Sequence, residues 1–215
     1  MIQSDYLPNT NFQILQDDTF YHFNSDTTLL GEFIQVKHKD TVLDIGCNTG
    51  ALLLYASRFQ PSLLCGIDLF EEVIELAKKN MELNEVEAEL YVCDVNQFEH
   101  DLFDVIISNP PYFNTKEESL KNENPYLEAA RHETYLPLDT LFSNVNRLLK
   151  DQGTFYMVHR PQRLLEILVK AHTYGLSIQE LQIVYKKVDS KPRSVLLKFK
   201  KSKHTELKIL EPLYI

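Results

Sequence analysis

The chain has 215 residues, of which 44% are hydrophobic and 25% are charged. This usage is close to the average for globular domains, which excludes a collagen-like, low-complexity or disordered chain. The net charge of −9 by itself argues against a nucleic-acid partner, because binding of phosphates depends on Lys and Arg.

Apolar runs alternate with helical patterns from about residue 27 onward, as in βαβ units with a mostly parallel sheet. A first helix is predicted to start at Ser25 or Asp26, either of which can cap it. The predicted strands then cover residues 41–45, 63–67, 88–93, 103–108 and 154–158. Helices are predicted at 51–58, at 71–83, from a cap at Asp139 onward, and from Pro161 to Gly175. Alternating residues at 177–188 and 194–200 predict an antiparallel hairpin, so the fold class is α/β with an open twisted sheet.

The whole chain, 1–215, is predicted to be one domain. It comprises an N-terminal segment (1–40), a parallel βα core (41–175) and a C-terminal hairpin with a basic tail (176–215). No apolar run could span a membrane and no signal peptide is visible, so we expect a cytoplasmic protein. The sequence does not fix the oligomeric state, and a monomer is slightly favoured. Cys47, Cys65 and Cys93 are odd in number and form no C-x-x-C pair, which predicts reduced, buried thiols and no metal site.

Three acidic residues lie at the ends of consecutive predicted strands, where ligands bind in open parallel sheets. Asp44 begins the glycine-containing loop Asp44–Gly50, whose backbone can approach a ligand, and its carboxylate can accept from a cationic amino group. Asp68 lies about 20 residues further on and suits the two hydroxyls of a ribose. Asp94 is placed to accept from an adenine amino group. The alternative is that these acids only end strands and cap helices.

The sequence Asn109-Pro110-Pro111-Tyr112 directly follows the fourth parallel strand, at the same edge of the sheet. The two prolines fix the backbone, so that the Asn109 side-chain oxygen and the Pro110 carbonyl can accept both hydrogens of one amino group. This would localise the nitrogen lone pair toward a methyl donor. Tyr112 can stack on a base taken out of its helix. The alternative is a rigid Pro-Pro turn.

Residues 186–203 contain eight Lys or Arg and one Asp, a local charge of +7, which leaves −16 for the rest of the chain. Such a run is either a solvated face or a local patch that binds RNA, and the two stay open. His159 stands alone at the end of the fifth strand and is expected to be structural rather than a base.

The loop Asp44–Gly50 resembles the acid-x-Gly-x-Gly-x-Gly loop of class I S-adenosylmethionine-dependent methyltransferases. Asn48 replaces the middle glycine, and Asn tolerates the positive φ that the turn needs. The acid Asp44 would repel a dinucleotide pyrophosphate, which favours a sulfonium cofactor over NAD. The tetrad Asn109–Tyr112 resembles the NPPY motif of methyltransferases that act on adenine N6 or on release-factor glutamine.

Further segments narrow this resemblance to the bacterial tRNA1(Val) adenine-37 N6-methyltransferases. They are Ala129–Glu133, His159–Leu164, Lys191–Arg193 with the basic tail that follows, and Phe23–Asp26 ahead of Leu29. The resemblance implies a Rossmann-like, mostly parallel sheet of seven strands with a C-terminal antiparallel hairpin. It also implies S-adenosylmethionine as cofactor, tRNA as partner, and N6 methylation of adenine 37 in a valine tRNA.

The candidate site residues fall into three groups. Those expected to bind the cofactor are Phe23, Asp26, Asp44, Gly46, Asn48, Gly50, Asp68, Leu69, Asp94, Val95 and Asn109. Those expected to act in catalysis are Asn109, Pro110 and Tyr112. Those expected to contact the substrate are Pro111, Tyr112, Phe113, Arg131, His132, Lys191, Arg193, Lys198, Lys200 and Lys201.

Three other functions are considered. Release-factor glutamine methyltransferases share the tetrad but usually carry an N-terminal helical domain, and the 43 residues before Asp44 are too few for one. Methyltransferases of guanine N2 in rRNA often have Phe where this chain has Tyr112. A non-catalytic adaptor with a methyltransferase-like fold would bind RNA or protein without turnover, and the intact tetrad argues against it.

Overall fold

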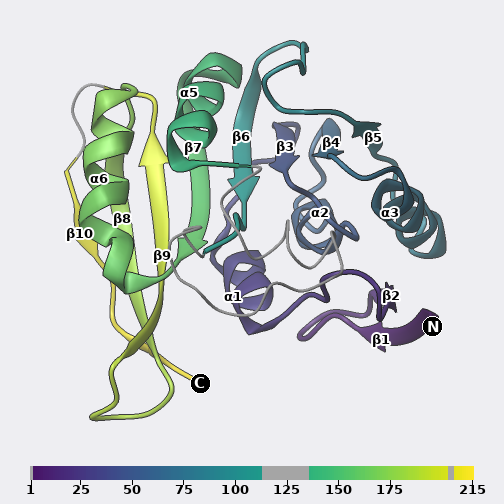
Figure 1. The fold of residues 1–215 in the computed structure, drawn as a ribbon, viewed down its shortest axis with the longest axis horizontal. Coiled ribbons are helices and arrows are strands. Elements are labelled where there is room, and N and C mark those ends of the chain that lie inside the picture. The colour runs from purple at the N-terminus through teal and green to yellow at the C-terminus, as the bar shows by residue number, and fades with distance from the viewer. Residues whose placement is uncertain (1, 113–135, 203–205) are drawn as a thin grey trace.

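The structure is a computed structural model that describes residues 2–112, 136–202 and 206–215. Its main feature is one sheet with the strand order β10-β8-β9-β7-β6-β3-β4-β5, with β11 also paired to β8 (Figure 1). The parallel strands are β3 (Thr41–Ile45), β4 (Leu63–Asp68), β5 (Glu89–Val92), β6 (Phe103–Ser108) and β7 (Leu149–His159). Their carboxyl ends therefore meet at a single edge, which sets the place of the site.

The C-terminal hairpin extends this sheet on the side of β7. It consists of β8 (Ser177–Tyr185) and β9 (Pro192–Lys200), and β9 lies between β7 and β8, antiparallel to both. The predicted α/β fold with a mostly parallel sheet and a C-terminal antiparallel hairpin is thus confirmed, and within the described residues the sheet has nine strands rather than seven. Two short strands that were not predicted, β10 (Lys208–Ile209) and β11 (Leu213–Tyr214), pair in parallel with β8.

Helices cover both faces of the sheet, because successive residues of each strand point to opposite faces. On one face α1 (Ser25–Phe33), α2 (Ala51–Ser57) and α3 (Glu71–Leu83) pack on a core that includes Val42 and Val105. On the other face α5 (Leu138–Leu148) and α6 (Leu164–Thr173) pack on Leu43 and Ile106. The short helix η1 (Pro161–Arg163) leads from β7 into α6. None of the helices in the described ranges is long and apolar enough to cross a membrane.

Two predicted helix starts are wrong by one or two residues. The cap of α1 is Asn24 rather than Ser25 or Asp26, since its Oδ1 accepts from the backbone amides of Asp26 (2.8 Å) and Thr27 (3.2 Å). At α5 the residue before the helix is Pro137, and the Asp139 carboxylate instead pairs with Lys170, 2.5 Å away. A cation on a neighbouring helix thus engages the side chain that was expected to cap the backbone.

A second, two-stranded sheet precedes the main one and was not predicted. It is the antiparallel hairpin of β1 (Ile2–Tyr6) and β2 (Gln13–Asp17). The buried side chain of Asn80 on α3 holds β2, because it accepts from the Leu15 amide (2.6 Å) and donates to the Leu15 carbonyl (3.0 Å). This hairpin thereby fixes the start of the segment that runs over the carboxyl edge of the main sheet.

Candidate functional site: a cavity at the strand ends

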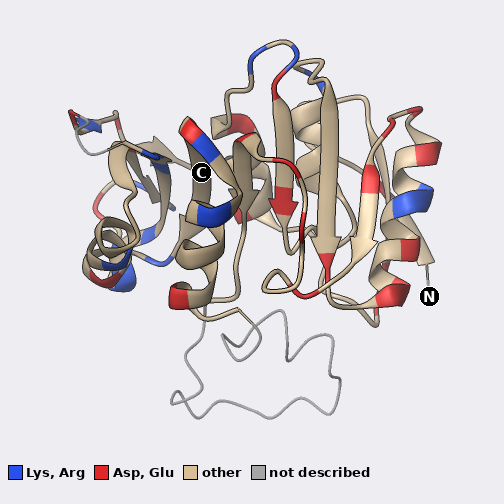
Figure 2. Cartoon of the chain, turned by 90° about the horizontal axis from the view of Figure 1, so that it is seen from above, with Lys and Arg blue, Asp and Glu red and all other residues tan. Residues whose placement is uncertain are grey.

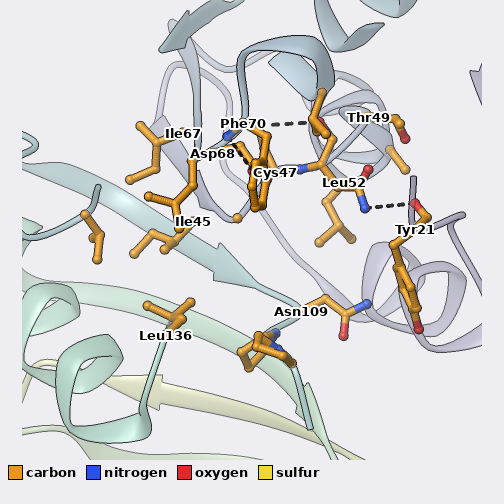
Figure 3. Close-up of a pocket in the computed structure, with 18 of the residues that line it drawn as sticks. Tyr21, Ile45, Cys47, Thr49, Leu52, Ile67, Asp68, Phe70, Asn109 and Leu136 are labelled. Atoms are coloured by element: carbon orange, nitrogen blue, oxygen red, sulfur yellow. Dashed lines mark hydrogen bonds between the residues drawn. The ribbon is translucent and has the colours of Figure 1, made fainter. Parts of the chain in front are cut away.

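A cavity opens at the carboxyl edge of the parallel strands, between this edge and the N-terminal segment (Figure 3). Five stretches of chain and two further residues contribute to its wall. They are the N-terminal segment (Tyr21, Phe23, Thr27), the loop after β3 (Ile45–Thr49, with Ala51 and Leu52), the end of β4 (Ile67–Phe70), Cys93–Val95, Asn109–Pro111, and the single residues Val73 and Leu136. The strand-end residues Asp68, Asp94 and Asn109 thus share one cavity, as the sequence predicts.

The loop after β3 has the left-handed turns that its glycines predict. Gly46, Asn48 and Gly50 have φ values of 74°, 48° and 85°, so Asn48 adopts the positive φ expected of its position. At Gly50 the left-handed φ favours glycine, whereas a Cβ there would contact only the flexible end of the Met81 side chain, at 2.7 Å, and the Ala77 side chain and backbone at ordinary distances. The loop is fixed by the Asn48 amide, which donates to Asp68 Oδ2 (3.0 Å), and by the Asn48 side chain, which donates to the Tyr21 carbonyl (2.9 Å; Figure 3).

Asp44 is fully buried directly behind this loop. Neither of its carboxylate oxygens accepts a hydrogen bond from any residue that the structure describes. Burial, and next the charge of Asp68, raise the pKa of Asp44 well above the usual value. Asp44 is not among the residues that line the cavity, so its influence on a ligand acts from behind the loop. An unpaired buried carboxylate favours a cationic group nearby.

Asp68 and Asp94 line the cavity itself. Asp68 accepts from the amides of Asn48 (3.0 Å) and Phe70 (3.4 Å), while burial raises its pKa against these hydrogen bonds. Asp94 Oδ1 accepts from the amide and the side chain of Asn96, at 2.8 and 3.0 Å. Leu69 and Val95 follow these acids on the wall, so both strand ends present a carboxylate beside an apolar side chain.

Asn109 directly follows β6, and both the nitrogen and the oxygen of its side-chain amide make hydrogen bonds. Its Nδ2 donates to Thr27 Oγ1 (3.1 Å), and its Oδ1 accepts from the Tyr112 hydroxyl (2.5 Å). The contact with Thr27 fixes the orientation of the amide, so the oxygen points away from α1. Pro110 and Pro111 continue the cavity wall beside it.

Tyr112 does not lie open to a base, as its predicted stacking role would require. Its side chain is buried, with the Arg160 Cζ 4.8 Å from the ring centroid and the His159 ring against it at 5.1 Å. Burial, and next the charge of Asp26, raise the pKa of Tyr112 well above its ordinary value, so the phenol keeps the proton that it donates to Asn109. Arg160 therefore covers one face of the ring on which the base was expected to stack.

His159 is buried at the end of β7. Its Nδ1 accepts from the Arg160 amide (2.8 Å), and burial, with a further contribution from Arg163, lowers the pKa of His159 to about 3. The ring is therefore neutral at physiological pH, as expected of a structural residue.

The N-terminal segment reaches the site through residues on both sides of Asn24. Tyr21, Phe23 and Thr27 line the cavity. Asp26 does not line it; its buried carboxylate accepts from Ser194 Oγ (3.0 Å) and lies 4.0 Å from Arg160. The cofactor contact expected of Asp26 stays a prediction, and the structure places this side chain nearer to Tyr112 and the hairpin. Tyr21 and Thr27 were missed, since no spacing rule singles them out.

The basic stretch of the hairpin is divided between the two ends of the sheet. Antiparallel pairing puts Val195 opposite His159, but Lys200 opposite Thr154, so the end of β9 points away from the cavity edge. There the lysines have protein partners: Lys198 pairs with Glu180 (3.0 Å), and the ammonium groups of Lys200 and Lys201 donate to backbone carbonyls at 2.9 Å.

At the near end of the hairpin, Lys186, Lys187 and Lys191 are exposed in the turn, and Arg193 donates to Ser25 on α1. Lys and Arg are interleaved with Asp and Glu over several elements (Figure 2). The predicted patch is therefore not one continuous face. The expected substrate residues Phe113, Arg131 and His132, and Lys203 of the basic stretch, lie outside the described residues.

The three cysteines are free thiols, as predicted, with Cys47 and Cys65 buried and Cys93 partly exposed. Burial raises the pKa of Cys65 to about 12, so this thiol is unreactive. Within residues 2–112, 136–202 and 206–215, no three His, Cys, Asp or Glu residues are grouped as metal ligands would be.

A parallel sheet with a glycine-containing loop, strand-end acids and Asn109-Pro-Pro-Tyr112 at one cavity is the arrangement of a class I S-adenosylmethionine-dependent methyltransferase. Residues 20–177 match the family model "Methyltransferase small domain", and the chain belongs to that family. A 16S rRNA N2-guanine methyltransferase of T. thermophilus, solved with AdoMet and guanosine, has the same fold. Its TM-score is 0.67 at 17% identity, over 93% of this chain and 50% of that one.

Sequence identity to curated relatives identifies a family within this class of methyltransferases. The chain is 32% identical to the tRNA1(Val) (adenine(37)-N6)-methyltransferase of Phocaeicola vulgatus, over 90% of this chain and 85% of the relative. It is 30% identical to the protein of the same name from Aliivibrio salmonicida, over 76% of this chain and 72% of the relative. The chain therefore belongs to the tRNA1(Val) (adenine(37)-N6)-methyltransferase family.

Proposed function

We propose that this protein methylates the N6 amino group of adenine 37 in a valine tRNA, in the cytoplasm and as a monomer. The observation that carries the proposal is Asn109, whose side-chain oxygen lies at the same cavity as the strand-end acids. Membership of the family named for this reaction supports it.

The donor set of the cavity fits S-adenosylmethionine. Asp68 offers carboxylate oxygens to hydroxyl groups, and Asp94 offers them to an adenine edge. Asp44 adds a buried carboxylate without a partner among the described residues; its ionised form is stabilised by a cationic group nearby, which favours the cationic amino acid end of the cofactor over a pyrophosphate. S-adenosylmethionine, when bound, supplies a methyl group on a positively charged sulfur. Gly46 lines the cavity and has no side chain, so the loop backbone can come close to the ligand there.

Asn109 and Pro110 prepare the nucleophile. An amide oxygen has two lone pairs, so Asn109 Oδ1 can accept an amino hydrogen while it still accepts from Tyr112. The Pro110 carbonyl can accept the second hydrogen. Drawing both hydrogens out of the plane localises the lone pair of an adenine amino nitrogen, which is otherwise delocalised into the ring. The nitrogen would then form the new bond to the methyl carbon while the bond from that carbon to sulfur breaks, its electron pair staying on the sulfur of a neutral thioether that leaves. The nitrogen would release one proton to water.

No general base is required at this site, and neither His159 nor Tyr112 is in a state to act as one. His159 is neutral and buried against Tyr112, with its Nδ1 already accepting from the Arg160 amide. Tyr112 keeps its proton. Catalysis therefore rests on hydrogen bonds that orient the amino group, rather than on proton transfer to a side chain.

The surface beside the cavity edge supplies a place for the RNA backbone. Lys186, Lys187 and Lys191 in the hairpin turn are exposed, while Arg193 lies at the base of the same turn. Cations at this position can bind phosphates next to a base that has entered the site. The overall charge of −9 makes the binding depend on these few residues and sensitive to salt.

The test compares nucleosides from total tRNA, by mass spectrometry, between cells with and without the gene. We expect loss of N6-methyladenosine from a valine tRNA, and its return when purified protein and S-adenosylmethionine are added. An unchanged tRNA profile would contradict the proposal. A loss of N2-methylguanosine from rRNA, or of methylglutamine from a release factor, would instead support the alternative substrates.

A further inference from the structure

Beside Asn109, next to the cavity, the arginine Arg160 lies over Tyr112, and the proposed function does not use this contact. The guanidinium carbon of Arg160 lies 4.8 Å from the centre of the Tyr112 ring, over its face. A planar cation on an aromatic face occupies the position that a stacked base needs. Arg160 and an adenine therefore cannot both stack on this face of Tyr112.

The contacts that hold Arg160 in this place are weak. Its side chain is 35% exposed, its distance to Asp26 is 4.0 Å, and its NH1 donates to the Arg193 carbonyl at 3.3 Å. If the guanidinium left, Asp26 would still accept from Ser194 at 3.0 Å. The Arg160 backbone would stay fixed, because its amide donates to His159. Only the side chain needs to move; the buried Asp26 then loses its ion-pair partner at 4.0 Å and keeps the hydrogen bond from Ser194.

A second arginine in the molecule shows what a permanent contact of this type looks like. Arg58 lies over Tyr55 at 4.9 Å, but it also donates to the carbonyls of Tyr55 (3.1 Å) and Gly31 (2.9 Å) and pairs with Glu32 at 3.2 Å. The ring distances of the two arginines are equal within 0.1 Å, yet Arg58 makes three strong polar contacts and Arg160 makes long ones. Arg58 is therefore structural, whereas Arg160 is free to exchange its partner.

We propose that Arg160 occupies the base position on Tyr112 while RNA is absent, and moves to a phosphate beside the target adenine when the base enters. A guanidinium suits this exchange, since it stacks on aromatic rings and also binds phosphate through a bidentate fork. Arg160 is thus a substrate-positioning residue, whose side chain leaves the face of the Tyr112 ring and binds a phosphate of the RNA backbone. This inference rests on the proposed function.

The test measures methylation of tRNA by the full-length protein and its variants at several salt concentrations. For Arg160→Ala we expect the KM for tRNA to rise about tenfold and the slope of log KM against log salt to fall by about one. Affinity for S-adenosylmethionine and kcat at saturating tRNA should stay near those of the unchanged protein. Arg160→Lys, which keeps the charge, should keep the salt slope.

Arg58→Ala is the matched control, because it removes the same ring contact far from the target base. It should lower thermal stability without a change in KM or in the salt slope. Arg160→Gln replaces the alanine variant if that variant fails to bind S-adenosylmethionine. An unchanged KM and slope, or a loss confined to kcat, would overturn the proposal. Failure of the unchanged protein to methylate tRNA would instead refute the proposed function, so the two failures are distinct.

Discussion

The two sides of the cavity differ in how far their polar groups are already satisfied. On the cofactor side, defined by Asp44–Gly50 with Asp68 and Asp94, both oxygens of the buried Asp44 lack a partner among the described residues. On the target side, defined by Asn109–Tyr112 with Asp26 and Arg160, every polar group named has one. Asn109 bonds Thr27 and Tyr112, Asp26 bonds Ser194, and Arg160 covers Tyr112.

This difference indicates how the two ligands are received. The ionised form of an unpaired buried carboxylate is unfavourable, and a cationic ligand relieves this cost, so the cofactor side is preformed for binding. The target side has to exchange existing contacts for new ones, so an incoming base must supply the binding energy that opens it. A small cofactor then binds without rearrangement, while the polynucleotide is selected by the contacts that it replaces.

The largest expected effect is at Asn109. Asn109→Ala removes the oxygen that both Tyr112 and the amino group need, and we expect kcat to fall about a thousandfold. Binding of S-adenosylmethionine, measured by calorimetry, should change little, because the acids of the cofactor side are untouched. Full activity of this variant would contradict the mechanism, and a parallel loss of cofactor affinity would show that the two sides are not separable.

The substitution Asp44→Asn tests whether the buried, unpaired carboxylate of Asp44 lowers the stability of the protein without cofactor. The folded protein holds the Asp44 proton more tightly than the unfolded chain, so the wild type loses stability as pH rises from 3.8 through the folded pKa. At pH 7 the variant, measured without cofactor, should be more stable by about 1–3 kcal/mol in urea unfolding. This gain in stability should shrink as the pH falls. The affinity of the Asp44→Asn variant for S-adenosylmethionine should be lower than that of the unchanged protein.

Asp94→Asn is the control for this measurement. The carboxylate of Asp94 already accepts two hydrogen bonds from Asn96, so its replacement should not stabilise the protein. If Asp44→Asn were destabilising at pH 7, the description of the cofactor side as preformed and unpaired would be wrong.

The two ends of the hairpin carry the next prediction. Neutralising Lys186, Lys187 and Lys191 to Gln should reduce the dependence of tRNA binding on salt, lowering the slope by about 2. The same change at Lys198, Lys200 and Lys201 should leave this slope nearly unchanged, because these ammonium groups bind Glu180 and backbone carbonyls at the far end of the sheet. Filter binding at several salt concentrations distinguishes the two triple variants. Equal slopes would indicate that both ends of the hairpin bind RNA as one basic patch.

The smallest expected effect is at Asn48. Asn48→Gly keeps the positive φ but removes the hydrogen bond to the Tyr21 carbonyl, which holds the N-terminal segment at the cavity. The affinity for S-adenosylmethionine should fall up to about fivefold, in line with one hydrogen bond. Measured kcat should not change. Unaltered affinity would mean that the anchor to Tyr21 does not contribute to cofactor binding.

Much of the fold follows from apolar patterns in the sequence. The bounds of β3, α3 and β6 agree with the predicted ones, because each is a regular apolar pattern between clear turns. The hairpin of β1 and β2 escaped prediction since β1 is exposed along its whole length and has no buried face to mark it. The start of β7 was placed at Thr154 rather than Leu149, because the polar residues between them give no strand signal.

The candidate site likewise has residues whose positions could be predicted from the sequence and residues whose positions could not. Asp68, Asp94 and Asn109 could be brought together from sequence, since the strand-end rule needs only chain order. The place of Arg160 could not, because it depends on a side chain after β7 crossing to a ring after β6. The only signal was the resemblance of the His159–Leu164 segment to the family. The positions of Asp26 and Lys198 likewise depend on the register of β9, which no local pattern reveals.

The hydrogen bond between Asp26 and Ser194 joins residues 168 positions apart. Every described residue that lines the cavity lies between Tyr21 and Leu136, whereas the target side also needs β9. Contacts over such long separations close late in folding, because the intervening loop loses much entropy. During synthesis on the ribosome, the residues of the cavity wall are therefore complete before Ser194 exists. We expect a nascent chain to acquire its place for RNA last, once the final strand has been made.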